Sequence, residues 1–218
     1  MQSKTLKYHL PHGHTAKLFS LLEKCVNENE ELGIIIKQEI KLLISQIQEV
    51  QFSNDDMASH FPVDIEVCTK IKHYTHEFSW SRGDLSILIL LYKADEVFGE
   101  NYYNFMADTV GKVVSTRRKL LPINQNPFIR NGTAGIAHCF STLYNLSNKS
   151  FYKEAYDYWI SETYRYKTLG FLESNHNDFL DNYEGVNLIL KNYEKGEKGD
   201  CSFYSSTPKN TTTVIFCL

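Results

Sequence analysis

Residues 132–163 read GTAGIAHCFSTLYNLSNKSFYKEAYDYWISET. The first half is uniformly apolar over residues 136–144 and follows two glycines, which predicts a buried helix. The second half places Ala155 and Trp159 one helical turn apart among polar residues, as in an amphipathic helix with one buried face. This stretch therefore predicts a hairpin in which an apolar inner helix is followed by a turn and an amphipathic outer helix.

The same unit recurs along the chain. Gly83 precedes the apolar run LSILILLY at residues 85–92, and an aromatic pair follows Gly83 and Gly132 at the same offset. Although ILILL suits a buried strand, its position between a glycine and a polar turn favours a helix. Gly13 and Gly185 head similar units. The sequence therefore predicts an all-α fold of about four helical hairpins.

Two further segments have the helical period. Residues 32–50 place one set of apolar side chains on a single face: Ile36, Ile40, Leu43, Ile44 and Ile47. Residues 102–119 gather a second set: Phe105, Met106, Thr109, Val110 and Val113. We expect a helical domain over residues 1–194, followed by a polar loop and tail over residues 195–218 that is rich in Gly, Ser and Thr.

Composition limits the classes of function. A content of 42% hydrophobic and 13% aromatic residues excludes a mainly disordered chain. A formal net charge of −3 provides no general attraction to nucleic acid or to an anionic membrane. Apolar runs are too short for a membrane span, and the N-terminus lacks the apolar core of a signal peptide. Because five scattered cysteines do not form a disulfide framework, we expect a cytoplasmic protein.

The motifs resemble those of the lanthionine synthetase C-like family, the lanthipeptide cyclases. The stretch at residues 132–163 resembles the segment after the family's zinc-binding Cys-His-Gly motif. SWSRGDLSILILLYKA, at residues 79–94, resembles its Trp-Cys-Tyr-Gly-Asp segment. Weaker matches are LPHGHTAKLFSLL to the His-Gly hairpin, SHFPVDIE to the linker before the first zinc cysteine, and NYEGVNLIL to the final hairpin. All five occur in the family's order.

The resemblance implies an α/α toroid of the six- or seven-hairpin barrel type, in which inner helices surround a central site. In the family, a zinc ion there activates a peptide cysteine thiolate, which adds to dehydroalanine or dehydrobutyrine and closes a thioether ring. Family members are about twice as long as this chain, so the resemblance implies an incomplete toroid. Because an open arc exposes apolar walls, we expect an oligomer, a complementing subunit, or the remnant of a longer gene.

The zinc ligands of the family are absent from this sequence. The family holds zinc through one cysteine and an adjacent Cys-His pair. The matching positions here are Ser81 for the first ligand, and Arg130 and Asn131 for the pair. A serine hydroxyl is a poor zinc ligand, and a guanidinium keeps its proton and repels a dication. We therefore predict that the chain holds neither zinc nor another cofactor.

Other positions of the family's site also differ. Glu77 stands where the family has an arginine, and Arg82 where it has a tyrosine. We expect both, together with Asp84, to neighbour the same pocket. The family's acid/base histidine remains as His12, the candidate catalytic residue. Asp84 and Glu184 stand at corresponding hairpin mouths, where a carboxylate could line a polar site or stabilise a helix dipole.

Histidines and cysteines elsewhere give weaker hypotheses. One cluster consists of His9, His12 and His14. Because no carboxylate or cysteine accompanies it, we expect a polar helix entry rather than a metal site. We place His73 and His76 in an exposed linker, and His138 and Cys139 in the core of a helix. The other cysteines have no neighbouring base in the sequence that would mark a nucleophile: Cys25, Cys68, Cys201 and Cys217.

Three functions follow. The favoured one is a degenerate, non-zinc homologue in lanthipeptide biosynthesis that binds a precursor peptide or modification enzymes. The second is a zinc-independent thioether cyclase with His12 as general base and Arg82 or Arg130 stabilising a thiolate or enolate. The third is a generic helical interaction module. Whether the chain is an enzyme stays open at this point, because the family is catalytic and its metal ligands are missing here.

Overall fold

A computed structural model describes residues 5–10, 13–25, 30–48, 58–172 and 178–197. Four helices head the repeated units: α1 (His14–Cys25), α3 (Leu85–Phe98), α5 (Thr133–Ser147) and α7 (Tyr183–Glu194). Three helices follow them: α2 (Glu30–Ile44), α4 (Tyr102–Val114) and α6 (Ser150–Thr168). Two short 3-10 helices lie at Pro122–Asn124 and Phe179–Asp181. The strands are β1 (Thr5–Lys7), β2 (Asp64–Glu66) and β3 (Lys72–His73).

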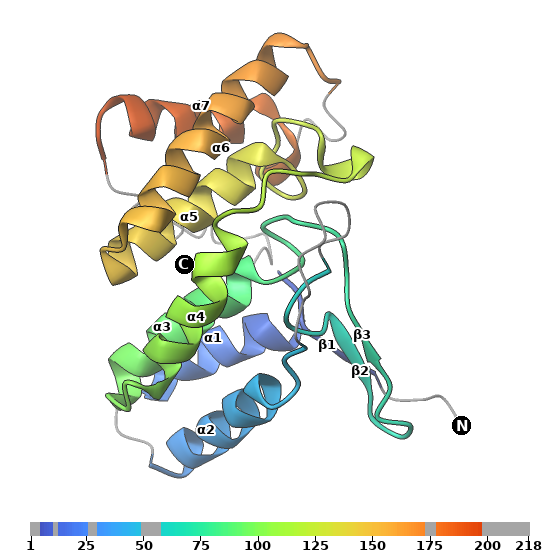
Figure 1. The fold of residues 1–218 in the computed structure, drawn as a ribbon, viewed down its shortest axis with the longest axis vertical. Coiled ribbons are helices and arrows are strands. Elements are labelled where there is room, and N and C mark those ends of the chain that lie inside the picture. The colour runs from blue at the N-terminus through green and yellow to red at the C-terminus, as the bar shows by residue number, and fades with distance from the viewer. Residues whose placement is uncertain (1–4, 11–12, 26–29, 49–57, 173–177, 198–218) are drawn as a thin grey trace.

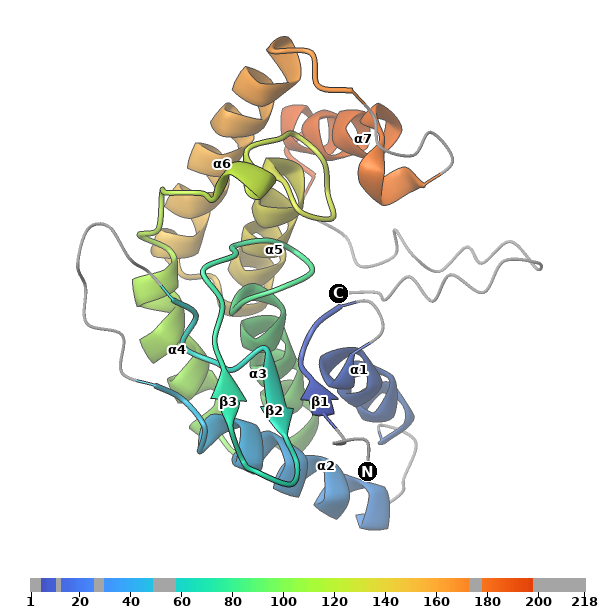
Figure 2. The ribbon, with the colours of Figure 1, turned by 90° about the vertical axis from the view of Figure 1, so that its right-hand side faces the viewer.

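The helices form an arc of hairpins (Figure 1). Helix α1 pairs with α2, α3 with α4, and α5 with α6, while α1, α3, α5 and α7 pack against one another in chain order. In Figure 2, α4 and α6 lie to the left of α3 and α5, on the side away from α1 and α7. The predicted helical class is therefore confirmed. The described residues hold three complete hairpins and the first helix of a fourth.

The inner helices α3 and α5 form the centre of the core. Every residue over 85–92 is buried, so the apolar run is a helix and not a strand, as predicted. In α5 all residues over 133–143 are buried. Gly135 is required there, because a Cβ at this position would lie 1.8 Å from Ile129 O and 2.8 Å from the Cβ of Trp80. The glycine thus lets α5 pack directly against Ile129, in the segment before α5, and against Trp80, in the segment before α3.

Helix α4 buries a face that overlaps the predicted one only in part. The buried side consists of Tyr103, Ala107, Val110, Gly111 and Val114. Of the predicted set, Val110 is buried and Met106 and Val113 are half-buried, whereas Phe105 and Thr109 are exposed and were placed wrongly. The hydroxyl of Tyr152 on α6 donates to Ala107 O at 3.2 Å, and a Cβ on Gly111 would overlap that hydroxyl.

A small antiparallel sheet accompanies the helices, in the order β1-β2-β3. Thr5 pairs with Glu66, and Asp64 pairs with His73. The sequence places His73 in a linker and does not predict these three short strands, which leave the helical class of the fold unchanged. Strands of two or three residues leave too short a pattern of alternating hydrophobicity to be recognised.

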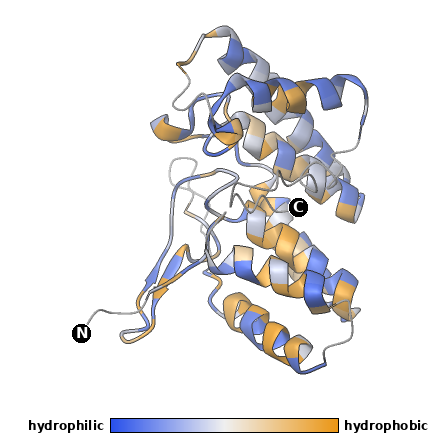
Figure 3. Ribbon diagram, turned by 180° about the vertical axis from the view of Figure 1, so that it is seen from behind, coloured by the Kyte–Doolittle hydropathy of each residue, from blue (hydrophilic) through white to orange (hydrophobic). Residues whose placement is uncertain are grey.

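Hydropathy varies along the arc (Figure 3). Helix α2, the lowest helix in that view, carries hydrophobic residues beyond its buried face: Ile34, Ile35 and Leu42 are 57%, 53% and 48% exposed. The face predicted for α2 is nevertheless the buried one, with Ile36, Ile40, Leu43 and Ile44 in the core. None of the described helices is both long and apolar enough to cross a membrane.

Candidate functional site

The segments that precede the inner helices meet along one side of the arc, at the N-terminal ends of these helices. We call this side the mouth and define it by residues 76–84, 124–132 and 178–182. Leu10 N donates to Ser81 O at 3.0 Å, and Ser81 N donates to Arg130 O at 3.3 Å. Ile129 N and Arg130 N both donate to Leu180 O at 3.0 Å. Backbone hydrogen bonds therefore join the entrances of α1, α3, α5 and α7.

Ser81 and Asn131 are in direct contact at the mouth. Ser81 Oγ donates to Asn131 Oδ1 at 2.7 Å, and Ser79 Oγ lies 3.2 Å from Ser81 Oγ. On the other side, Asn124 Nδ2 donates to Asn131 O at 2.7 Å. Ser81 is only 7% exposed, so this bond is largely protected from water. A hydroxyl and a carboxamide thus join the loop before α3 to the loop before α5.

The Arg130 side chain turns toward the entrance of α7. Its Nε donates to Asp181 Oδ2 at 2.7 Å, and its Nη2 donates to Asp178 Oδ2. Although partial burial opposes the charge, the hydrogen bonds and charges of Asp181 and Asp178 raise the pKa of Arg130 above its usual value. The guanidinium therefore stays protonated and is occupied by two carboxylates.

The mouth does not fit a zinc ion. Ser81 keeps its proton, because its hydroxyl is a hydrogen-bond donor to Asn131. Arg130 cannot accept a metal bond, and Asn131 already accepts from Ser81. Zinc sites in proteins use thiolate, imidazole and carboxylate ligands. Over the whole described part of the chain, moreover, no group of three or more His, Cys, Asp or Glu side chains is placed to hold a metal.

Glu77 and Arg82 pair with each other at the edge of the mouth. Arg82 Nη1 donates to Glu77 Oε1 at 3.0 Å, with 53% of the arginine side chain exposed. The loop that carries them is held by Ser79, whose Oγ accepts from Arg82 N at 3.1 Å. A water-exposed pair of this kind leaves neither side chain as an uncompensated charge in a pocket.

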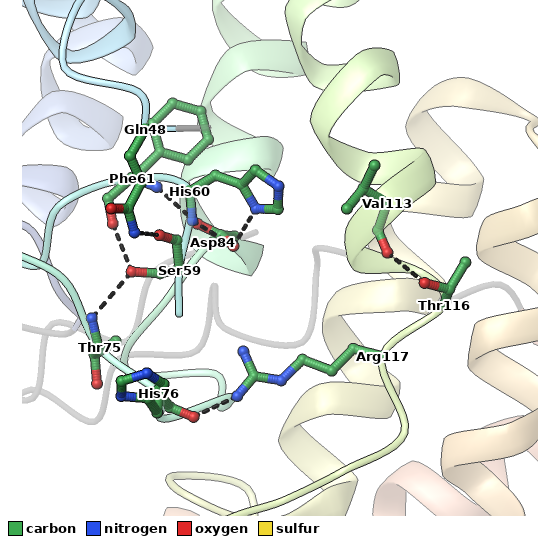
Figure 4. Close-up of polar contacts among 10 residues, drawn as sticks. All are labelled: Gln48, Ser59, His60, Phe61, Thr75, His76, Asp84, Val113, Thr116 and Arg117. Carbon is green, nitrogen blue, oxygen red and sulfur yellow. Dashed lines mark hydrogen bonds and ion pairs between the residues drawn. The ribbon is translucent and has the colours of Figure 1, made fainter. Parts of the chain in front are cut away.

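Asp84 is bound to residues 60 and 61, and its place as a neighbour of the pocket stays a prediction (Figure 4). It is 3% exposed, and its Oδ2 accepts from His60 N and His60 Nδ1, each at 3.1 Å. Its Oδ1 accepts from Phe61 N at 3.0 Å. Although Asp84 directly precedes α3, its side chain makes no capping bond to that helix. Its carboxylate therefore fixes the segment at residues 59–61 to the start of α3.

Arg117 holds the loop before α3 at His76 and Phe78, a role that the sequence analysis did not predict. Its Nη2 donates to His76 O (Figure 4). Its guanidinium also lies 4.7 Å from the centre of the Phe78 ring. Burial lowers the pKa of Arg117 to about 10, partly offset by the charge of Asp84. In the sequence Arg117 belongs to the basic run RRK, which resembles a solvated surface. Only its burial, at 6% exposure, reveals its role.

His12 lies outside the described residues, so the structure makes no statement about it. The neighbouring His14 donates through Nε2 to Glu39 Oε2 of α2 at 3.1 Å, and its ring packs edge-on against Tyr8. His14 therefore takes part in a contact between α1 and α2. Glu184 lies in the first turn of α7, where Asn182 caps the helix through Glu184 N and Gly185 N.

The remaining candidates have structural positions. His138 and Cys139 are buried within α5, as predicted, and burial lowers the pKa of His138 to about 4 and raises that of Cys139. His73 is half exposed, with Nε2 3.8 Å from Asp64 and 3.6 Å from Glu66. Cys25 is partly buried and Cys68 is exposed. Cys201 and Cys217 lie outside the described residues, as does the predicted tail from residue 198 onward.

Comparison with known proteins agrees with this architecture. The family model described as lanthionine synthetase C-like protein matches residues 1–186. A solved structure named nisin cyclase superposes with a TM-score of 0.70 at 15% sequence identity, covering 89% of this chain. The chain spans 48% of that cyclase chain, about half its length. No curated protein shows significant similarity to the sequence.

Proposed function

The chain belongs to the lanthionine synthetase C-like family, and on this basis we propose that it serves lanthipeptide maturation as a non-zinc member that binds a precursor peptide at the mouth. One observation carries the proposal: the mouth is held together by hydrogen bonds and ion pairs at the positions where the family has zinc ligands. Without a metal, a peptide thiol with a pKa of ~8.5 is mostly protonated at pH 7. Binding is therefore favoured over cyclisation.

An apolar surface beside the mouth suits a peptide. Leu121 and Ile123 are 38% and 60% exposed. They flank the mouth, because the adjacent Asn124 holds Asn131 O through its side chain. The neighbouring Arg118 lies over the ring of Tyr158, with its guanidinium 4.4 Å from the ring centre. Exposed apolar residues next to polar groups are common features of peptide-binding surfaces.

The alternative, zinc-independent cyclisation, receives less support. It needs a cation free to stabilise a thiolate or enolate, and the sequence offered Arg82 and Arg130. Arg82 is paired with Glu77, and Arg130 is paired with Asp178 and Asp181. Each guanidinium would have to leave a carboxylate before it could assist the reaction. Mass spectrometry after thiol alkylation tests this alternative, which requires faster loss of free thiol than in peptide alone.

Metal analysis and peptide binding test the proposal. We expect purified protein to contain far less than one zinc per chain, and stoichiometric zinc would contradict it. We also expect a synthetic peptide with one cysteine and one dehydroalanine to bind, measured by fluorescence anisotropy. Leu121→Ser combined with Ile123→Ser should weaken this binding about tenfold, since burial of two apolar side chains is lost.

A matched control distinguishes binding at the mouth from non-specific binding to exposed apolar side chains. Phe105 on α4 is 65% exposed, similar to Ile123, and lies near the opposite end of its hairpin. Phe105→Ser should leave peptide affinity unchanged. Equal weakening by Phe105→Ser and by the mouth variant, or absence of binding to the wild-type protein, would overturn the proposal.

A further inference from the structure

A second site lies on the side of the arc opposite the mouth, at the C-terminal ends of α5 and α7. It is a pocket of about 460 Å³ between the last turns of α5 and α7 and the first turn of α6. We call it the distal pocket. Helix α5 has 15 residues, so its two ends lie about 22 Å apart, at 1.5 Å per residue; the mouth lies before its first residue, and the pocket lining begins at Ser141. Its volume falls within the range of small-ligand sites, roughly 300–1,000 Å³.

Three tyrosines from three helices line the distal pocket: Tyr144 of α5, Tyr156 of α6 and Tyr193 of α7. The rings of Tyr156 and Tyr193 stand nearly perpendicular, at 86°, with centres 5.4 Å apart. Aromatic faces carry a negative quadrupole that attracts cations. The ammonium of Lys153 already lies 5.6 Å and 5.8 Å from the two ring centres. The ring pair therefore accommodates a positive charge.

The charges around the distal pocket also favour a cation. Its lining includes the carboxylates of Glu194 and Glu197 and the ammonium of Lys153. Glu197 is paired with Lys195 at 3.1 Å, whereas Glu194 Oε1 accepts from the neutral hydroxyl of Tyr164 at 2.6 Å, so the charge of Glu194 is the one that a ligand cation would meet. Lys153 is also paired with Asp157, one turn further along its own helix, which gives it a partner if it leaves the rings. Both α5 and α7 end here, and helix C-termini carry partial negative charge.

We propose that the distal pocket binds an arginine or lysine side chain of a peptide, with Lys153 as the internal cation that this side chain displaces. The proposal deepens the function proposed above and rests on it for the identity of the ligand as a peptide. Tyr193 and Tyr156 would contact the cation, and Glu194 would compensate its charge. A precursor peptide could then engage the arc at two separate places.

Two peptides that differ only in charge provide the test. An eight-residue peptide with one central arginine is compared with the same peptide carrying citrulline, which has nearly the same shape and no charge. Fluorescence anisotropy should show at least about tenfold tighter binding of the arginine peptide. Tyr193→Leu, which keeps an apolar residue, and Glu194→Gln should each weaken it about fivefold. Equal affinity for the two peptides would overturn the proposal.

Lys153→Met is the most discriminating variant. If Lys153 competes with the ligand, removing its charge tightens binding of the arginine peptide by about fivefold. If the pocket instead serves an anion, the same substitution leaves the arginine peptide unbound, which would contradict the proposal. Lys153→Met should also retain the fold, because the lysine side chain is 41% exposed.

The two proposals fail in different ways. Leu121→Ser combined with Ile123→Ser should not alter binding of the arginine peptide. If the arginine peptide shows no preference over citrulline while the dehydroalanine peptide still binds at the mouth, only the distal pocket is disproved. If the arginine peptide binds as expected and the dehydroalanine peptide does not, the distal pocket stands and the proposed function falls.

Discussion

The α5–α6 interior and the mouth both join segments of the arc, but they use different kinds of contact. In the interior, contact is steric: Gly135 of α5 leaves room for Ile129 O and Trp80 where the mouth segments pack onto the helix, and Trp159 and Phe140 are fully buried. At the mouth, contact is polar and involves Ser81, Asn131 and Arg130. Close-packed side chains tolerate few substitutions. A hydrogen-bonded pair can be replaced by another donor and acceptor pair, provided that both residues change together.

This difference predicts how the two regions respond to substitution. The glycine and the large aromatic residues of the interior must stay together, because each fills space that another leaves. At the mouth, polar side chains keep neighbouring loops joined, and other hydrogen-bonding pairs could take their place. Substitutions in the interior should therefore cost more stability than substitutions at the edge of the mouth.

The largest effect should come from Gly135→Ala. Its new Cβ would lie 1.8 Å from Ile129 O, so backbone must move, at a cost of about 3 kcal/mol in free energy of unfolding. Gly99→Ala is the control, because a Cβ on Gly99 would meet nothing within 4 Å and only the φ of 64° opposes a side chain. The control should cost about 1 kcal/mol. Urea denaturation measures both, and similar costs would refute the steric argument.

Asp84→Asn should have the next largest effect, about 2 kcal/mol. The buried carboxylate accepts from three N–H donors, and an asparagine amide group would place a donor opposite one of them. Asp64→Asn serves as control, because that side chain is 32% exposed. A loss for Asp84→Asn no greater than that for Asp64→Asn, in the same urea assay, would show that the Asp84 contacts are dispensable.

Acidification should destabilise the interior through His138. Burial lowers its pKa from 6.5 to about 4, so below pH 6.5 the unfolded chain takes up a proton that the folded chain does not. Stability is therefore complete above pH 6.5 and falls as the pH drops toward 4, by about 2 kcal/mol at pH 5. His138→Gln should flatten this dependence. Parallel curves for the two proteins between pH 7.5 and pH 5 would contradict it.

The smallest effect should come from Arg82→Ala. Its ion pair with Glu77 is exposed to water, so its loss should change the free energy of unfolding by less than about 0.5 kcal/mol. Comparison with Asp84→Asn then separates two charged residues only two positions apart in the sequence. A loss above about 1 kcal/mol for Arg82→Ala would mean that the edge of the mouth is as constrained as the buried segment behind it.

Much of the fold could be predicted because its signals are local. The apolar run at residues 85–92 and the unit at residues 132–163 identify helices from their own periodicity. The contact between Ser81 and Asn131 lies at positions that the resemblance had grouped together. The buried face of α4 was predicted only in part. Phe105 and Val110 are both apolar, but only Val110 is buried, and the contact that Tyr152 makes with Ala107 comes from another helix.

The partners of the buried polar side chains also could not be predicted from neighbouring residues in the sequence. Nothing adjacent to Asp84 indicates that it accepts from His60 and Phe61, and Arg130 finds Asp178 and Asp181 only because the entrances of α5 and α7 meet. Arg117 is hidden in a basic run whose neighbours are exposed. Each of these contacts depends on segments that folding brings together.

By itself the sequence determined the helical hairpins, their order, and the types of side chain available at the mouth. These follow from hydrophobic periodicity and from covalent chemistry, since a hydroxyl, a guanidinium and a carboxamide differ from thiolates and an imidazole in any fold. The tertiary structure decided which faces are buried, where Asp84 and Arg130 point, and that three tyrosines form the distal pocket. Those features depend on distances between segments far apart in the chain, which only packing fixes.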